Sequence, residues 1–126
     1  MNSNLFLEKL NSLTSPYFQY QKYAEVFIRC KVIDDNTVEF LDFISLNPFD
    51  ATKIIKLICN LADEMAVVLI GMAYSSWIGP SITNDNTFRK GMDIDRLLKW
   101  YKKYNFSIKE INNKFYIKRN PNDNQN

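Results

Sequence analysis

The sequence has no histidine, and among its 126 residues it has only three glycines and two cysteines. The absence of histidine excludes serine–histidine and cysteine–histidine catalysis, and a zinc site would need other ligands, so we expect no metal centre. Cys30 and Cys59 each lie in an apolar stretch without CxxC spacing. We therefore expect two buried, unpaired thiols in a reducing compartment.

Long apolar runs are also missing. The longest, residues 65–73, is interrupted only by Gly71 and is far too short to cross a bilayer. Glu8 and Lys9 interrupt the N-terminal region, where a signal peptide needs an unbroken apolar segment. These absences predict a soluble, cytoplasmic protein without membrane partners.

Apolar side chains are nevertheless abundant, because 46% of the residues are hydrophobic and 14% are aromatic. This composition is too apolar for a disordered chain, and the length suits one domain with a real core. We expect a single domain over residues 1–120 and a disordered, asparagine-rich tail over residues 121–126.

Charge is unevenly distributed along the chain. Residues 1–88 carry 6 Lys/Arg and 10 Asp/Glu, whereas residues 89–126 carry 10 Lys/Arg and 4 Asp/Glu. The basic C-terminal third could attract a phosphate-rich ligand or an acidic partner, or it could simply be the solvated face of a helix and a hairpin. Basic and aromatic residues alternate at 99–103 and 114–119 as on nucleic-acid surfaces, but amphipathic elements give the same pattern, so nucleic acid is not the expected partner.

Apolar spacing predicts the order of the elements. We expect a helix over 3–13, strands over 23–33 and 37–46, a helix over 51–64, a buried strand over 66–74, a helix over 92–106 and a hairpin over 106–119. Residues 75–91 form a long polar loop in this scheme, of a length that is often functional. The order predicts an α/β (α+β) domain, whose mixed, mostly antiparallel sheet carries helices on both faces.

Polar residues mark the ends of these elements. Ser3, Asp50 and Asp93 are predicted helix N-caps, and Asn112-Asn113 is the expected turn of the last hairpin. Strict alternation along the second strand places its residues on two faces, with Val38, Phe40 and Asp42 on one and Glu39, Leu41, Phe43 and Ser45 on the other.

Several stretches resemble the GNAT acetyltransferase family: LADE at 61–64, the buried strand at 67–73, LLKWYKKYNFSI at 97–108 and KFYIKRNP at 114–121. The third is similar to a family pattern in which a tyrosine near the end of the last helix precedes a helix-ending glycine and a phenylalanine. Tyr101 and Phe106 match it, and Asn105 takes the position of the glycine, which asparagine replaces well in left-handed backbone. The fourth resembles the closing strand of small GNAT-like proteins, including phage-encoded ones.

The resemblance implies acetyl-CoA as the cofactor and an amine as the acceptor. It implies that the pantetheine arm lies on the backbone of Phe43, Ile44, Ser45 and Leu46, and the pyrophosphate on Ala51, Thr52 and Lys53. Tyr101 would be the general acid that protonates the leaving thiolate, with Tyr104 as its substitute; helical spacing alone equally predicts Tyr101 as a core residue. Glu39 and Asp42 would help to deprotonate the amine, or are ordinary exposed carboxylates.

Two departures from the family keep a second hypothesis open. The turn at 48–53 has no glycine, and Asp50 places a negative charge where a phosphate would bind. The N-terminal part has one short helix where the family has a strand and two helices. The sequence is therefore compatible with an N-acetyltransferase, or with a catalytically inactive GNAT-fold protein, for example a phage-encoded inhibitor, that binds a protein partner.

Overall fold

The computed structural model describes residues 2–74, 77–78, 89–90 and 92–122. In these ranges the elements are α1 (Asn2–Leu13), β1 (Ser15–Tyr17), β2 (Tyr20–Tyr23), β3 (Val26–Asp34), β4 (Thr37–Ser45), α2 (Pro48–Met65), β5 (Val68–Ala73), β6 (Trp77–Ile78), β7 (Arg89–Lys90), α4 (Ile94–Lys103), β8 (Ser107–Ile111) and β9 (Lys114–Arg119). Apart from the short β6–β7 pair, the loop expected at 75–91 lies outside the described residues, as do residues 123–126 of the expected tail.

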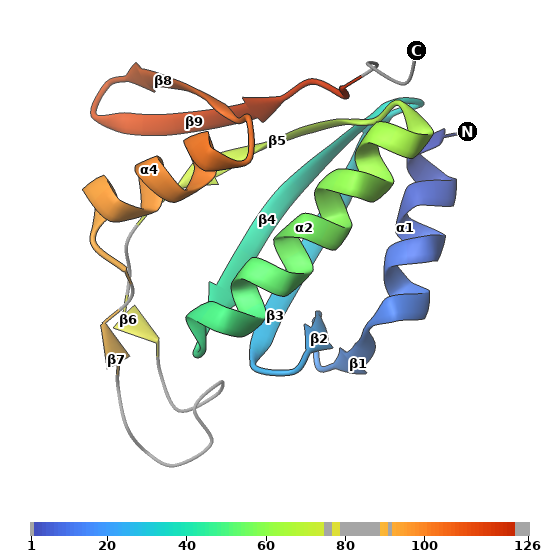
Figure 1. The fold of residues 1–126 in the computed structure, drawn as a ribbon, viewed down its shortest axis with the longest axis horizontal. Coiled ribbons are helices and arrows are strands. Elements are labelled where there is room, and N and C mark those ends of the chain that lie inside the picture. The colour runs from blue at the N-terminus through green and yellow to red at the C-terminus, as the bar shows by residue number, and fades with distance from the viewer. Residues whose placement is uncertain (1, 75–76, 79–88, 91, 123–126) are drawn as a thin grey trace.

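Seven of the strands form one sheet in the order β1-β2-β3-β4-β5-β9-β8 (Figure 1). β4 and β5 are parallel, and the other neighbouring strands of this sheet are antiparallel. β9 lies between β5 and β8, although it follows β8 in the chain. The predicted α/β domain with a mixed, mostly antiparallel sheet is confirmed.

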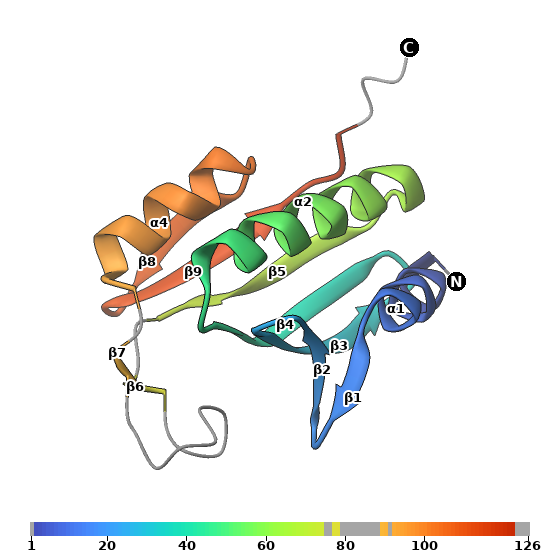
Figure 2. The ribbon, with the colours of Figure 1, turned by 60° about the horizontal axis from the view of Figure 1, so that its bottom comes forward.

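The described helices all lie on one face of this sheet, whereas the sequence pattern predicts helices on both faces (Figures 1 and 2). α1 packs against α2 and β3. The connection from β4 through α2 to β5 and that from β5 through α4 to β8 advance in the same direction across the sheet. Because crossovers between parallel strands are almost always right-handed, such connections place their helices on the same face.

One large core joins the three described helices to the sheet. Its fully buried members include Phe6, Leu10, Val38, Ile54, Ile55, Ile58 and Leu69. Cys59 is buried in this core and Cys30 packs against it, both as free thiols. Burial raises the pKa of Cys30 to about 12 and that of Cys59 to about 11, so both thiols stay protonated and are poor nucleophiles.

Asparagines hold the left-handed turns that the sequence predicts. Asn105, just after α4, has a φ of 71°, and Asn112 and Asn113 in the β8–β9 turn have φ values of 52° and 64°. Ser3 differs from its prediction, because it lies inside α1 and its hydroxyl donates a hydrogen bond to the carbonyl oxygen of Thr37 at 3.3 Å. It therefore ties α1 to the start of β4.

A buried ion pair connects β9 to α2 and α4. Arg119 is 3% exposed, and its Nη1 and Nη2 donate to the two carboxylate oxygens of Asp63 at 2.7 and 3.0 Å. Arg119 Nε also donates to the carbonyl oxygen of Tyr104 at 2.9 Å, and the backbone N–H of Asn122 donates to Asp63 at 2.7 Å. The end of β9 is thus bound to the last turn of α2 and to the residue that follows α4.

Candidate functional site

β4 and β5 separate halfway along their length. Their parallel pairing runs from Thr37 and Val68 to Phe40 and Gly71, and β4 then continues to Ser45 without a partner on that side in the described chain. The separation coincides with a β-bulge, because Cys30 of β3 lies opposite Phe40 whereas Arg29 lies opposite Asp42. The extra residue is Leu41, and bulges of this kind bend a strand and redirect its side chains.

The bulge reverses the predicted faces of the second half of β4. Strict alternation would put Asp42 beside Phe40 and Phe43 on the opposite face. In the structure Phe43 packs against the core, with its ring centroid 5.9 Å from that of Phe40, and Asp42 pairs with Arg29 on the other face. The inserted Leu41 accounts for this change, and a period of two along a sequence cannot reveal it.

A cavity of about 620 Å³ opens where the two strands part. Its walls come from the second half of β4, the first turn of α2, the residue after β5, and α4 with the two residues before it. The described residues that line it are Leu41, Asp42, Phe43, Ile44, Ser45, Leu46, Pro48, Ala51, Thr52, Tyr74, Met92, Asp93, Arg96, Leu97, Trp100 and Tyr101.

Most of the predicted site residues meet in this cavity. Phe43, Ile44, Ser45, Leu46, Ala51, Thr52 and Tyr101 all line it. Glu39 does not, because it lies in the paired half of β4, opposite Lys31 and Ile70. Lys53 is an exposed residue of α2 and does not line it either. The predicted base and the predicted phosphate-binding lysine are therefore separated from the other members of the set.

Tyr101 reaches the cavity from the buried side of α4. It is 5% exposed, and its ring lies 5.2 Å, centroid to centroid, from the rings of both Trp100 and Phe106. Burial, reinforced by the nearby Tyr74, raises the pKa of the Tyr101 hydroxyl well above its usual range. The hydroxyl is therefore protonated and able to donate a hydrogen bond at any physiological pH.

Asp42 forms a small polar network at the opening between the strands. Arg29 Nε donates to Oδ2 of Asp42 at 2.7 Å, and the Tyr74 hydroxyl donates to Oδ1 at 3.1 Å. Burial, followed by the charge and hydrogen bond of Asp42, raises the pKa of Tyr74. Tyr74 follows β5, so this hydrogen bond joins the two strands beyond the point where they separate.

The N-terminus of α2 differs from its prediction. The helix begins at Pro48, and its N-cap is Asn47, whose Oδ1 accepts the backbone N–H of Phe49 at 2.9 Å. Asp50 is not the cap; its carboxylate accepts the backbone N–H of Glu25 at 3.3 Å. The reason is the proline, because its fixed φ suits the first helical position and starts the helix before Asp50.

Few backbone donors at this helix end are available to a ligand. Pro48 has no N–H, that of Phe49 is bonded to Asn47, and that of Ala51 donates to the carbonyl oxygen of Asn47 at 3.1 Å. A glycine-rich phosphate-binding turn works by presenting several free N–H groups to the anion. Within the described residues, α2 does not provide such a cradle, and the carboxylate of Asp50 lies in its first turn.

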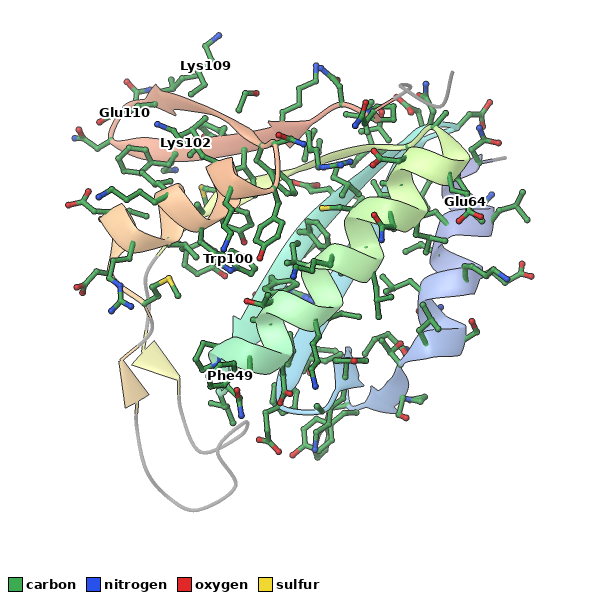
Figure 3. The ribbon with its side chains drawn as sticks, viewed as in Figure 1. Phe49, Glu64, Trp100, Lys102, Lys109 and Glu110 are labelled. Atoms are coloured by element: carbon green, nitrogen blue, oxygen red, sulfur yellow. The ribbon has the colours of Figure 1, made fainter. Side chains whose placement is uncertain are left out.

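Sequence reasoning missed two cavity residues on α4, Arg96 and Trp100. They are four residues apart and therefore lie on the same side of the helix. Figure 3 shows Trp100 on the side of α4 that faces α2, whereas Lys102 extends from the opposite side. Their spacing from Tyr101 gave no signal, because residues one and five positions before it do not share its side of the helix. Tyr104, the proposed substitute for Tyr101, does not line the cavity.

Comparison with models of known protein families, with curated protein sequences and with solved structures found no match. Among the described residues, no helix combines the length and apolar character that a bilayer crossing needs. The same residues include no cluster of three or more potential metal-ligating side chains of the His, Cys, Asp or Glu type. The site must therefore be interpreted from its own geometry.

Proposed function

We propose that the chain is a GNAT-like N-acetyltransferase, which transfers the acetyl group of acetyl-CoA to an amine. One observation carries the proposal: the half of β4 that has no partner on its β5 side in the described chain, and the buried hydroxyl-bearing residue Tyr101, lie on the walls of the same cavity. The order of elements from β4 to β9 also follows the order of the family that the sequence resembles.

The free side of β4 suits the pantetheine arm of the cofactor. The arm is a narrow chain with two amide groups, and an extended chain of amides can pair with an unpaired strand as an added strand would. Within the described residues, Phe43 to Leu46 are paired with β3 or the turn before it on one side only. The cavity flanks them on the other side, where Leu97 and Trp100 of α4 supply apolar contacts.

Tyr101 would act on the sulfur of the donor. In the reaction the amine nitrogen forms a C–N bond to the thioester carbonyl carbon, the C–S bond breaks, and the electron pair remains on sulfur. A thiol has a pKa of about 8.5, far below that of the buried tyrosine, so complete proton transfer from Tyr101 is unfavourable. Its role is hydrogen-bond donation to the developing thiolate, and the proton lost by the amine then neutralises the sulfur through solvent.

Of the two carboxylates that the sequence suggests for the acceptor side, Asp42 lines the cavity and Glu39 does not. Both oxygens of Asp42 already accept hydrogen bonds, from Arg29 and from Tyr74. It would attract and orient a cationic amine at the opening rather than deprotonate it. Most of the rate acceleration would then come from holding amine and thioester together.

The α2 N-terminus favours a second candidate. Because Pro48 has no N–H, the N–H groups of Phe49 and Ala51 are already bonded, and Asp50 lies in the first turn, this helix end is a poor site for a pyrophosphate. That feature supports a GNAT-fold protein that binds a protein partner and transfers no acetyl group. Under this alternative the cavity would bind no acetyl-CoA.

The deciding experiment measures thermal stability with and without millimolar acetyl-CoA, followed by release of free CoA in the presence of a panel of amines. Ligand at about 100 times its dissociation constant stabilises the folded state by about 2.7 kcal/mol. We expect a higher melting temperature and amine-dependent CoA release. Tyr101→Phe should still be stabilised by acetyl-CoA, but its rate of CoA release should be at least tenfold lower. The matched Tyr104→Phe variant should match the wild type in both the stabilisation and the release rate. No stabilisation of the folded protein would reject the transferase and favour the second candidate.

A further inference from the structure

The donor bound in this cavity would carry a phosphate-rich end that α2 cannot accommodate. Pro48, Phe49 and Ala51 offer no free N–H group to it, for the reasons given above. Asp50 also places a negative charge in the first turn of the helix. A pyrophosphate and a 3′-phosphate together bring several negative charges, and they require cations close to the mouth of the cavity.

α4 supplies the positive charge that α2 lacks. It carries one Arg and three Lys against the single Asp95. Among the described residues that line the cavity, Arg96 is the only cation, and neither Lys53 nor Lys56 of α2 belongs to that lining. Arginine is also the side chain best suited to phosphate, because its planar donors bind two phosphate oxygens at once.

An aromatic residue lies one helical turn further along α4. Trp100 is half-buried, lines the same cavity, and has its ring centroid 5.8 Å from that of Phe43 on β4. Its ring therefore lies beside β4, the strand that would hold the arm, and its position in α4 is one helical turn from Arg96. Arg96 and Trp100 together form a continuous path for a donor that leaves β4 along α4.

We propose that Arg96 binds a phosphate group of the donor and that Trp100 contacts the chain leading to it, so that the donor runs along α4 instead of turning onto the N-terminus of α2. This inference rests on the proposed function. It predicts that recognition of the cofactor's phosphates depends on α4 and is independent of the first turn of α2.

The test compares the affinities of acetyl-CoA, acetyl-dephospho-CoA and acetyl-pantetheine for the full chain by isothermal titration calorimetry. Arg96→Gln should weaken acetyl-CoA binding roughly tenfold to a hundredfold, the range for loss of charge-assisted hydrogen bonds, and leave acetyl-pantetheine binding unchanged. The affinity of Arg96→Lys for acetyl-CoA should lie between those of the wild type and Arg96→Gln. If Arg96→Gln also weakens binding of acetyl-dephospho-CoA, Arg96 contacts the pyrophosphate. If it weakens binding of acetyl-CoA alone, Arg96 contacts the 3′-phosphate.

Two control variants make the result specific. Lys102→Gln removes a cation from the same helix, on the side away from Trp100, and should change acetyl-CoA affinity less than threefold (Figure 3). Lys53→Gln tests the rival site on α2. The inference is overturned if Arg96→Gln leaves acetyl-CoA affinity unchanged, whatever the effect of Lys53→Gln, or if Arg96→Gln weakens acetyl-pantetheine binding equally. If the wild type binds none of the three donors, the proposed function fails and the inference fails with it.

Discussion

Replacement of Arg119 by methionine should destabilise the protein strongly. Methionine retains much of the apolar volume of the arginine stem, but it removes the two donors to Asp63 and the donor to the Tyr104 carbonyl. Loss of one partner from a buried ion pair costs about 3–5 kcal/mol. Because the Asp63 side chain is 21% exposed and water can reach it, the lower end applies, about 3 kcal/mol. For a chain of this size that corresponds to a fall in melting temperature of about 12 °C.

Urea denaturation and thermal melting of Arg119→Met measure this loss, with Lys118→Met as the matched control. Lys118 is the preceding residue of β9 and is exposed, so its replacement should change stability by less than about 0.5 kcal/mol. Introducing Asp63→Asn into the wild type and into Arg119→Met completes a double-mutant cycle, in which we expect a coupling energy above about 1 kcal/mol. If Arg119→Met and Lys118→Met were equally stable, the ion pair would not hold β9 to α2.

The Asp63–Arg119 ion pair also makes the stability of the fold depend on pH. Burial acts to raise the pKa of Asp63, but the hydrogen bonds and charge of Arg119 and the N–H of Asn122 outweigh it, and the net pKa is lowered. A carboxyl with a lower pKa in the folded state stabilises it above the unfolded pKa of about 3.9 and loses this contribution as pH falls through the folded value. Stability measured from pH 6 to pH 2 should therefore fall more steeply for the wild type than for Asp63→Asn. If stability fell equally steeply with pH in the wild type and in Asp63→Asn, the lowered pKa of Asp63 would not contribute to it.

Three further substitutions test individual features. Asn105→Ala should lower the free energy of unfolding, measured by urea denaturation, by about 1 kcal/mol, because alanine tolerates left-handed backbone poorly. Asn105→Gly should leave it unchanged. If both variants lost the same amount of stability, the φ of 71° at Asn105 would not be the cause. Asn47→Ala should cost about 1 kcal/mol through loss of the bond to the Phe49 N–H, and an unchanged urea midpoint would argue against that cap. Gly71→Val should cost about 1–3 kcal/mol, since a Cβ there lies 3.3 Å from the Phe40 carbonyl oxygen; an unchanged melting temperature would show that β4 and β5 can move apart.

Features set by neighbouring residues were predictable from sequence. The left-handed Asn105 and the Asn112-Asn113 turn follow from the conformational tolerance of asparagine, and the amphipathic pattern of α4 places Tyr101 on its buried side. These predictions are confirmed because each depends on a few adjacent positions. They needed no knowledge of which strands pair.

Features set by pairing or by competition between residues were not predictable in the same way. The extra Leu41 is defined only by its register against β3, so the positions of Asp42 and Phe43 could not be read from alternation. Asp50 is an acceptable cap in isolation, but Pro48 and Asn47 start the helix earlier. Of the predicted carboxylates the cavity wall therefore includes Asp42 but not Glu39, and its cation is Arg96 rather than the predicted Lys53.

The position of β9 inside the sheet has a consequence for folding kinetics. A ribosome delivers β8 before β9, yet β8 has no neighbour other than β9 in the described sheet, and β5 lacks one of its two neighbours until β9 arrives. The β8–β9 hairpin can form locally and quickly, but its insertion beside β5 must close a long loop of chain. We therefore expect docking of this hairpin to limit the folding rate. Until the hairpin docks, β5 presents an open strand edge that is prone to aggregation.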